Sequence, residues 1–365
     1  MDITISNVII EEGADNYKQT EVILRKLENV PIKRVEKNYP NKKDISVNMD
    51  KETLRLIDFK GEFFKPCPGT KGYICCGYHI LNTGTNCPFN CSYCILQVYF
   101  NQPSLRVFVN LEHELDTVGH FLDLNHKKLF RIGTGEFTDS LALDHVTDWS
   151  KTLTRFVNAH KNVVLELKTK TDNINGLFSS SYRERIVVSW SMNSIAISAK
   201  EEHGATSIIK RLKAAKRCQE EGYIISFHFD PLIYFKDWKN GYLKTIELID
   251  KYINLKKVIW ISMGCIRYIP ALKFIIRKRH HDTHILDGEF ITGLDGKMRY
   301  FKPIRIEMYS FMKEFLDKLE NNLGLYLCME SPEIWLKSFG WSPENSNGLS
   351  DYLNKRVNKL YKTNY

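Results

Sequence analysis

From about residue 76 onward, short apolar runs alternate regularly with longer amphipathic stretches. The short runs are rich in β-branched residues and almost continuously apolar, which is typical of parallel strands buried on both faces. The longer stretches repeat apolar residues at the spacing of helices that cover a sheet. We therefore predict an α/β fold, a partial (β/α)6 barrel of the TIM type. The predicted strands are 78–84, 127–135, 162–170, 184–193, 223–231 and 256–264.

The chain on either side of this alternation has a different pattern, so we predict three parts. They are an N-terminal α/β segment (1–72), the barrel (73–285) and a C-terminal extension with a hairpin and helices (286–365). Gly-rich turns favour the hairpin, and apolar periodicity favours the helices. The helices predicted along the chain are 17–30, 111–124, 143–160, 206–222, 241–253 and 305–322, the hairpin is 287–301, the N-terminal strand lies in 52–64, and 323–341 runs from strand to helix.

Composition narrows the class of protein. The chain has 365 residues, 43% of them hydrophobic, enough for one large domain or a core with appendages. The apolar run 258–266 is too short to span a bilayer and the N-terminus lacks a secretory pattern, so we expect a cytoplasmic protein. A net charge of +9, with basic runs at 31–43 and 274–281, favours an anionic partner, although solvated faces also explain it. In a reducing compartment, nine cysteines are metal ligands, catalytic groups or core thiols rather than disulfides.

Three cysteines lie close together directly after the first predicted barrel strand. Cys87, Cys91 and Cys94 form a C-x-x-x-C-x-x-C pattern in "TGTNCPFNCSYCILQ". Three thiolates hold three irons of a cubane cluster and leave the fourth iron open to another ligand, as a catalytic metal keeps one position open. The pattern therefore predicts a [4Fe–4S] cluster. A zinc site is the alternative, because Cys67, Cys75, Cys76 or His79 supplies further ligands on spacing alone.

The cysteine pattern, with the aromatic Tyr93 before its last cysteine, resembles that of the radical S-adenosylmethionine superfamily. Within it the chain resembles the spore photoproduct lyase family, in order from about residue 74 to the end and more weakly before it. The segments that carry the resemblance are "CPFNCSYCILQ", "DHVTDWSKTL", "LKTKTDNI", "VVSWSMNS", "AAKRCQEEGYIISFHFDPLIYFKDWKNGY" and "GKMRYFKPIRIEMYSFMKEFL".

The resemblance implies a [4Fe–4S] cluster and S-adenosylmethionine as cofactors. The methionyl group chelates the open iron, one electron cleaves the cofactor, and the 5′-deoxyadenosyl radical takes a hydrogen atom from the substrate; the protein binds, orients and excludes water. It further implies a repair lyase with a DNA substrate and an electron donor such as flavodoxin or ferredoxin as partner. Two rivals remain: a radical enzyme acting on RNA, a peptide or a small metabolite, and a non-catalytic zinc- or cluster-bearing nucleic-acid-binding protein.

The resemblance also assigns cofactor-binding roles to residues at the strand ends, where parallel α/β folds gather functional groups. Tyr93 would cover the cofactor, Gly133, Gly135 and Glu136 would form the superfamily's amine-binding element, Lys170 would meet the carboxylate, and Ser191 and Asn193 would meet the ribose. The alternatives are an ordinary turn, a solvated lysine and a buried network between strands.

Two positions depart from the family pattern. Glu136 stands where the family carries its hydrogen-donating cysteine, and Ile95 stands where it often has a tyrosine. The resemblance therefore supports cofactor and fold better than the exact reaction. As catalytic residues we predict Tyr93 and Cys265, the latter expected to face the barrel mouth. The roles of Cys67, Cys75, Cys76 and Cys328 stay open, because buried thiols are commonly inert.

Basic and aromatic residues follow the sixth predicted strand. Such interleaving beside a barrel mouth favours nucleic acid, whereas a basic helix face with core aromatics is the alternative. His228 and Asp230, at the fifth strand end, are either substrate-facing acid–base groups or a structural pair. The basic and aromatic residues are Arg267, Lys273, Arg277, Lys278, Arg279, Lys297, Arg299, Tyr300, Phe301, Lys302 and Arg305.

Overall fold

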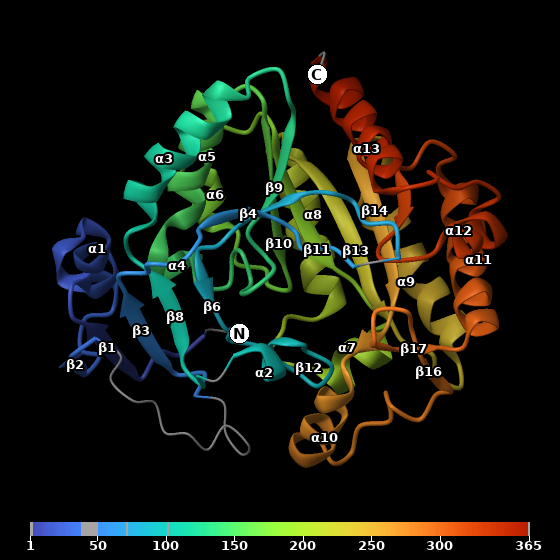
Figure 1. The fold of residues 1–365 in the computed structure, drawn as a ribbon, viewed down its shortest axis with the longest axis horizontal. Coiled ribbons are helices and arrows are strands. Elements are labelled where there is room, and N and C mark those ends of the chain that lie inside the picture. Colours follow the sequence, from blue (N-terminus) through green and yellow to red (C-terminus); the bar gives the residue numbers. More distant parts are fainter. Residues whose placement is uncertain (1–2, 38–49, 71, 101, 364–365) are drawn as a thin grey trace.

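The computed structural model describes residues 3–37, 50–70, 72–100 and 102–363. Its centre is a curved eight-stranded sheet in the order β18-β14-β13-β11-β10-β9-β5-β4 (Figure 1). Neighbouring strands run parallel, except for the edge strand β4, which is antiparallel to β5. The strands are β4 (Phe64–Pro66), β5 (His79–Leu81), β9 (Phe130–Gly133), β10 (Val163–Thr169), β11 (Ile186–Ser191), β13 (Ile224–Leu232), β14 (Val258–Cys265) and β18 (Leu325–Leu327).

The predicted partial barrel is thus observed, and each of the predicted barrel strands overlaps a strand of this sheet. The structure adds β18, which pairs with β14 as a further parallel strand. A strand was predicted at the start of 323–341, but its pairing with β14 is a long-range contact that the local pattern could not show. The C-terminal extension therefore contributes directly to the barrel sheet.

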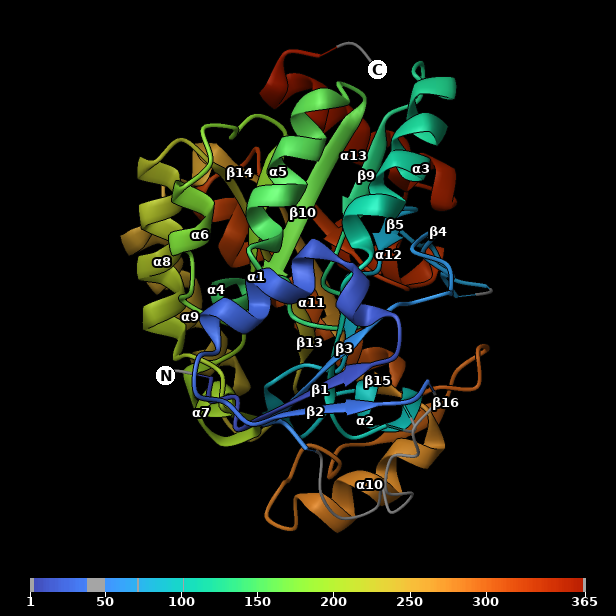
Figure 2. The same cartoon turned by 90° about the vertical axis from the view of Figure 1, so that its left-hand side faces the viewer.

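Helices cover the outer, convex face of the sheet (Figures 1 and 2). Among them, α5 packs on β10, α8 on β11 and β13, and α13 on β14, so the main hydrophobic core lies between sheet and helices. The helices are α1 (Lys18–Lys26), α2 (Leu96–Tyr99), α3 (Leu111–Leu124), α4 (Asp144–Thr147), α5 (Trp149–Ala159), α6 (Asn175–Phe178), α7 (Ile195–Glu201), α8 (Ile208–Glu220), α9 (Trp238–Tyr252), α10 (Pro270–Arg279), α11 (Lys302–Leu319), α12 (Pro332–Phe339), α13 (Ser346–Tyr361) and the 3₁₀ turns Ala14–Asn16 and Leu255–Lys257. Every helix in the described residues is too short or too polar to cross a lipid bilayer.

The helix predicted over 143–160 is interrupted. Asp148 adopts a left-handed conformation with φ of 53°, which separates α4 from α5. The Asp144 side chain bridges the break, because its Oδ1 accepts from the Ser150 amide at 2.7 Å and its Oδ2 from the Ser150 hydroxyl at 2.6 Å. Short polar residues favour such local turns over helix continuation.

A second sheet lies beside the barrel and is built largely from the N-terminal segment (Figure 2). Its strand order is β2-β1-β3-β8-β6. The strands are β1 (Asn7–Glu11), β2 (Ile32–Val35), β3 (Thr53–Ile57), β6 (Gly84–Thr85) and β8 (Leu105–Phe108). Strands β6 and β8 come from sequence on either side of the three-cysteine pattern, so this sheet anchors both ends of the cysteine loop.

Two small antiparallel sheets complete the fold. One joins β7 (Asn90–Cys91) to β12 (Glu202–His203). The other has the order β15-β17-β16 and contains the predicted hairpin. Its strands are β15 (Arg267–Tyr268), β16 (Phe290–Thr292) and β17 (Met298–Tyr300).

Candidate active site

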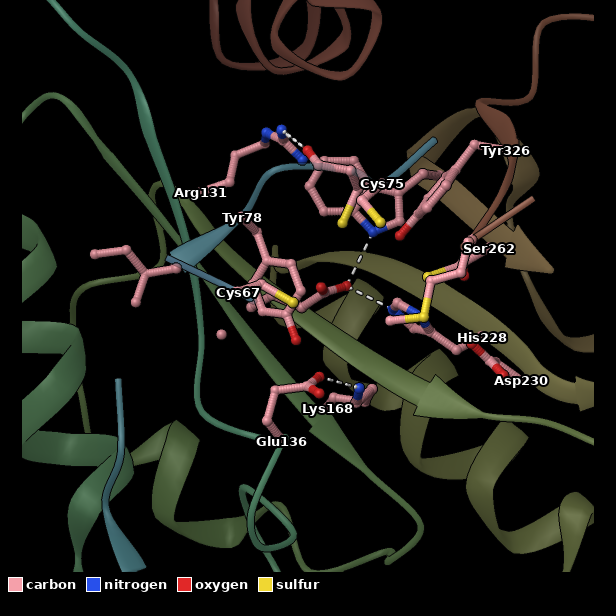
Figure 3. A pocket seen from close by; sticks show the side chains of 18 of the residues that line it. Cys67, Cys75, Tyr78, Arg131, Glu136, Lys168, His228, Asp230, Ser262 and Tyr326 are labelled. Carbon is pink, nitrogen blue, oxygen red and sulfur yellow. Dashed lines mark hydrogen bonds and ion pairs between the residues drawn. The ribbon is translucent and has the colours of Figure 1, made fainter. Parts of the chain in front are cut away.

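Two adjoining cavities lie at the carboxyl ends of the parallel strands. The larger has a volume of about 360 Å³ and is bordered by the cysteine loop, and the inner one has a volume of about 120 Å³ and extends along the barrel interior. Figure 3 shows how side chains from several strands converge on the inner cavity. Residues that line both cavities are Cys67, Gly135, Glu136, Lys168, Asp230, Arg267 and Met329.

The cysteine loop brings its three thiols to one place. Cys87, Cys91 and Cys94 all line the larger cavity. Burial raises the pKa of Cys91 to about 12 and also raises that of Cys87. A metal ion overcomes such a shift, because a coordinated thiol is deprotonated by the ion's charge.

Hydrogen bonds fix the shape of this loop. The Gln97 side-chain amide donates to the carbonyl oxygens of Ser92 at 2.9 Å and of Cys91 at 3.3 Å. Asn86 closes the base of the loop, because its amide donates to the carbonyls of Gln102 and Ser104, both at 2.7 Å. The loop is therefore held by its own side chains as well as by the second sheet.

Of the further ligands that the zinc interpretation required, Cys67 also borders the larger cavity, whereas Cys75, Cys76 and His79 do not. Cys67, Cys75 and Cys76 line the inner cavity. The His79 ring is stacked on Phe64, with ring centroids 5.0 Å apart. Among the described residues, no group of three or more His, Cys, Asp or Glu side chains is arranged to hold a single metal ion. Thiolates of a cubane cluster bind separate irons, so that cofactor does not require such convergence.

A buried carboxylate supports the loop from behind. Glu202 lies opposite Cys91 in the β7–β12 pair, and its Oε2 accepts from Arg211 at 2.6 Å. Its Oε1 accepts from the Tyr93 hydroxyl and lies 3.5 Å from the Lys170 ammonium. Burial raises the pKa of Glu202, but Lys170 and Arg211 lower it more, to about 2. The predicted cofactor residues Tyr93 and Lys170 line the larger cavity and are positioned by this carboxylate.

Glu136 lies between the two cavities. Its Oε1 accepts from the Lys168 ammonium at 3.0 Å, as Figure 3 shows. Burial raises the pKa of Glu136, but Lys168 and the Tyr78 hydroxyl lower it more, so the carboxyl is ionised. Gly135 allows close packing here, because a Cβ at this position would lie 3.0 Å from the Cβ of Lys168 and would push that side chain away. Lys170 was predicted as a cofactor-binding residue, whereas Lys168, two residues earlier on β10, was not.

The two predicted ribose-binding residues lie in different surroundings in the structure. Ser191 lines the larger cavity. Asn193 is 1% exposed and does not line either cavity; its amide donates to the Pro231 carbonyl at 3.0 Å and its Oδ1 accepts from the Tyr242 hydroxyl at 2.8 Å. Asn193 thus takes part in a buried network between strands.

His228 and Asp230 both line the inner cavity, but each has a different partner. His228 lies 2.8 Å from Glu166 Oε1, and Asp230 receives two hydrogen bonds from Arg267 at 2.9 and 3.1 Å. The same Glu166 oxygen accepts from Trp260 at 2.9 Å. The inner cavity is therefore lined by paired charges rather than isolated ones.

Cys265 does not lie where the strand register was expected to place it. On β14, Trp260 and Ser262 line the inner cavity, and Cys265 is an odd number of residues away. Its Sγ lies 3.9 Å from the sulfur of Met308 on α11, and it is 2% exposed. The structure places this thiol behind the sheet. The thiols that line the inner cavity are Cys67, Cys75, Cys76 and Cys328.

The basic residues of the C-terminal extension divide into two groups. Arg299 and Arg305 are buried and pair with Asp295 and Glu330 respectively. Tyr300 is fully buried, so for these residues the core alternative describes the structure. Other basic residues remain near the site or on the surface: Lys297 lines the larger cavity, and Arg277 and Lys278 are exposed on α10.

A family model described as "Spore photoproduct lyase" matches residues 75–333. The chain belongs to the spore photoproduct lyase family. A curated spore photoproduct lyase from Geobacillus sp. is 24% identical over 260 residues, covering 70% of this chain and 74% of the relative. The spore photoproduct lyase of Bacillus subtilis is 22% identical over 340 residues, covering 90% and 93% respectively.

Solved structures agree with this assignment. A spore photoproduct lyase complexed with dinucleoside spore photoproduct has a TM-score of 0.77 at 20% identity, covering 90% of this chain and all of the relative. A variant with bound S-adenosylmethionine and dinucleoside spore photoproduct has a TM-score of 0.78 at 20% identity, covering 91% of this chain. The predicted family, the partial-barrel fold and the prediction of a radical S-adenosylmethionine lyase-like enzyme are confirmed.

The residues present fit the cofactors of the spore photoproduct lyase family. Three thiols open onto one cavity of about 360 Å³, a size within the range of small-molecule sites. The cavity wall also carries Lys170, Ser191 and Glu136, which offer a cation, a hydroxyl and a carboxylate. The individual roles of these residues remain predictions.

Proposed function

We propose that this chain holds a [4Fe–4S] cluster on Cys87, Cys91 and Cys94, binds S-adenosylmethionine in the larger cavity, and splits a thymine dimer of the spore photoproduct type in DNA. The observation that carries the proposal is that all three cysteines line one cavity at the strand ends. Membership of the spore photoproduct lyase family supports the same chemistry. A structural relative with both S-adenosylmethionine and dinucleoside spore photoproduct bound supports it further.

When bound, the cluster and S-adenosylmethionine supply a 5′-deoxyadenosyl radical that abstracts a hydrogen atom from the substrate. The chain's own residues bind and orient the reactants. Glu136 would accept from the methionyl ammonium, Lys170 would meet the carboxylate, and Ser191 would bond a ribose hydroxyl. Both charged groups already have protein partners, Lys168 and Glu202, so they are held in place before a ligand binds.

The features of the inner cavity support a nucleotide substrate. Its wall carries the aromatic side chains of Tyr78, Trp260 and Tyr326, on which an extruded base can stack. Arg267 lines both cavities and Lys297 lines the larger one, so cations lie where a phosphate backbone would pass. An extruded dinucleotide therefore finds both stacking and charge complementarity here.

Cys67 is the thiol best placed to return a hydrogen atom to the product. It is the only one of the four inner-cavity thiols that also lines the larger cavity, where Glu136 is a common neighbour. Burial and the Glu136 carboxylate raise the pKa of Cys67 to about 12, so the group keeps its hydrogen at neutral pH. Cys67 would therefore replace the hydrogen-donating cysteine of the family, at whose usual position this chain has Glu136.

Anaerobically reconstituted protein, given a chemical reductant, should cleave S-adenosylmethionine and convert dinucleoside spore photoproduct to thymine. We expect cleavage to be faster with the dinucleotide present, because the substrate completes the site. The measurement is quantification of 5′-deoxyadenosine and thymine by chromatography. Cleavage of S-adenosylmethionine without any thymine would assign the chain to a different substrate, and a colourless protein that cleaves nothing would refute the proposal entirely.

Replacing Cys67 with alanine should uncouple the two products. We expect Cys67→Ala to cleave S-adenosylmethionine but to lower thymine recovered per cofactor cleaved by roughly tenfold or more, a barrier change of about 1.4 kcal/mol or more. Cys265→Ala is the matched control, because that thiol lies behind the sheet. If Cys265→Ala lowers the ratio and Cys67→Ala does not, the donor is Cys265 as the sequence first suggested.

A further inference from the structure

Lys51 reaches the cysteine loop from the N-terminal segment. It lies just before β3, and its Nζ donates to the Cys87 carbonyl oxygen at 2.5 Å. The residue is partly buried. Burial lowers the pKa of Lys51, and the charge of the Cys87, Cys94 and Cys91 thiolates opposes that shift. A lysine from outside the barrel thus contacts the cysteine loop at the backbone of Cys87, the first of its three cysteines.

In the part of the chain that the structure describes, the Lys51 ammonium forms no ion pair with a carboxylate, and its hydrogen bond goes to a neutral carbonyl. The ion pairs elsewhere in the loop's support, such as Lys170 with Glu202, do not include it. A buried cation is costly unless an anion compensates it. Three thiolates around a [4Fe–4S] core give a net negative charge, and reduction by one electron makes it more negative. The cluster would therefore supply the missing anion.

We propose that Lys51 is a positioning residue that sets the reduction potential of the cluster. Its positive charge favours the reduced, more negative state, since cluster potentials depend on nearby charge, hydrogen bonds and solvent exposure. Its hydrogen bond to the Cys87 carbonyl fixes the charge at one end of the loop. The inference rests on the proposed function only through the assignment of the three cysteines as cluster ligands.

Arg279 is a second cation near the loop, and its contacts differ from those of Lys51. Its guanidinium donates to Gln97 Oε1 at 3.3 Å, and Gln97 in turn holds the loop carbonyls. Arg279 therefore contacts the loop's supporting side chain, whereas Lys51 contacts a cluster cysteine directly. A purely mechanical role for Lys51 would be met by any hydrogen-bond donor, but an electrostatic role requires the charge.

The test uses the full chain, anaerobically reconstituted, with Lys51→Met, Lys51→Gln and Lys51→Arg. Lys51→Gln removes the charge but keeps a donor for the Cys87 carbonyl, and Lys51→Arg keeps the charge. The control is Lys60→Met, which removes an exposed lysine that pairs with Asp58 at 2.8 Å. Two quantities are measured without substrate. The first is the iron content, and the second is the ratio of reduced to oxidised cluster at a fixed solution potential, followed by electron paramagnetic resonance.

We expect that both neutral variants lower the reduced-to-oxidised ratio about tenfold, a shift of about 59 mV for one electron, while Lys51→Arg and Lys60→Met keep the wild-type ratio. Loss of iron in both neutral variants with retention in Lys51→Arg would also support the charge. A wild-type ratio in Lys51→Gln with full iron would overturn the inference and leave the proposed function intact. Failure of the wild-type protein to bind iron would overturn both.

Discussion

Cys91→Ala should bind no stable iron–sulfur cluster and should cleave S-adenosylmethionine only at the protein-free background. Cys91 is one of three thiols that open onto the larger cavity, and removing it leaves two ligands for a cluster that needs three protein thiolates. The side chain is small and lies in a minor cluster with Phe89 and Ala142, so we expect the fold to survive the change. Iron and sulfide analysis, visible absorption and 5′-deoxyadenosine formation measure the result.

The chain provides its own matched controls for this experiment. Cys75 and Cys328 are also partly buried thiols, but they line the inner cavity. Cys75→Ala and Cys328→Ala should keep full iron content and the wild-type rate of S-adenosylmethionine cleavage. If either control lost the cluster while Cys91→Ala kept it, the cofactor would belong to the inner thiols and the assignment of the loop would be wrong.

Glu202→Gln should destabilise the protein by about 3–5 kcal/mol, because it leaves a buried cation without its partner. Arg211 and Glu202 are both completely buried, and their ion pair measures 2.6 Å. Glu202 also accepts from Tyr93 and lies opposite Cys91 in the β7–β12 pair, so the cysteine loop should loosen with it. Chemical denaturation of the apoprotein gives the free energy of unfolding, and reconstitution gives the remaining cluster content.

The pH dependence of stability provides a second readout for Glu202. Its pKa falls from an ordinary 4.5 to about 2 in the folded chain. A lowered pKa stabilises the fold above the unfolded value, and this stabilisation is lost as the pH falls through the folded value. The wild-type apoprotein should therefore lose stability between about pH 4.5 and 2, and Glu202→Gln should lose less over that interval. Glu307→Gln, at an exposed carboxylate paired with Lys239, should leave both measurements nearly unchanged. An equal acid slope in wild type and Glu202→Gln would contradict this account.

The sequence predicted those features that depend on neighbouring residues. Apolar runs located the barrel strands, and the helix predicted at 111–124 coincides with α3. The spacing of the three cysteines was sufficient to predict that they share one site, because a short loop cannot separate them far. The strand at the start of 323–341 was also predicted and corresponds to β18, but its place in the barrel sheet was not.

Features that depend on tertiary pairing could not be read in this way. Glu202 lies more than a hundred residues from the loop that it supports, and no local pattern marks its partners. Lys168 and Lys170 occupy equivalent positions on one strand, and only the structure shows that Glu136 selects the first of them. Alternation along β14 from Trp260 and Ser262 places Cys265 on the opposite face, and only the structure shows which of the two faces borders the cavity.

The β6–β8 pair has a consequence for how the cofactor is acquired. Gly84 and Thr85 pair with Val107 and Arg106, so the two stems of the cysteine loop are joined by backbone hydrogen bonds. Gly84 permits no larger residue, since a Cβ there would lie 2.2 Å from the Arg106 carbonyl oxygen. Most of the entropy of closing the loop is therefore spent when the N-terminal sheet folds, before any iron arrives. Iron and sulfide would therefore bind a cysteine loop that is already ordered. A chain shortened at its N-terminus would have to order the loop and assemble the cluster together, at a higher cost in free energy.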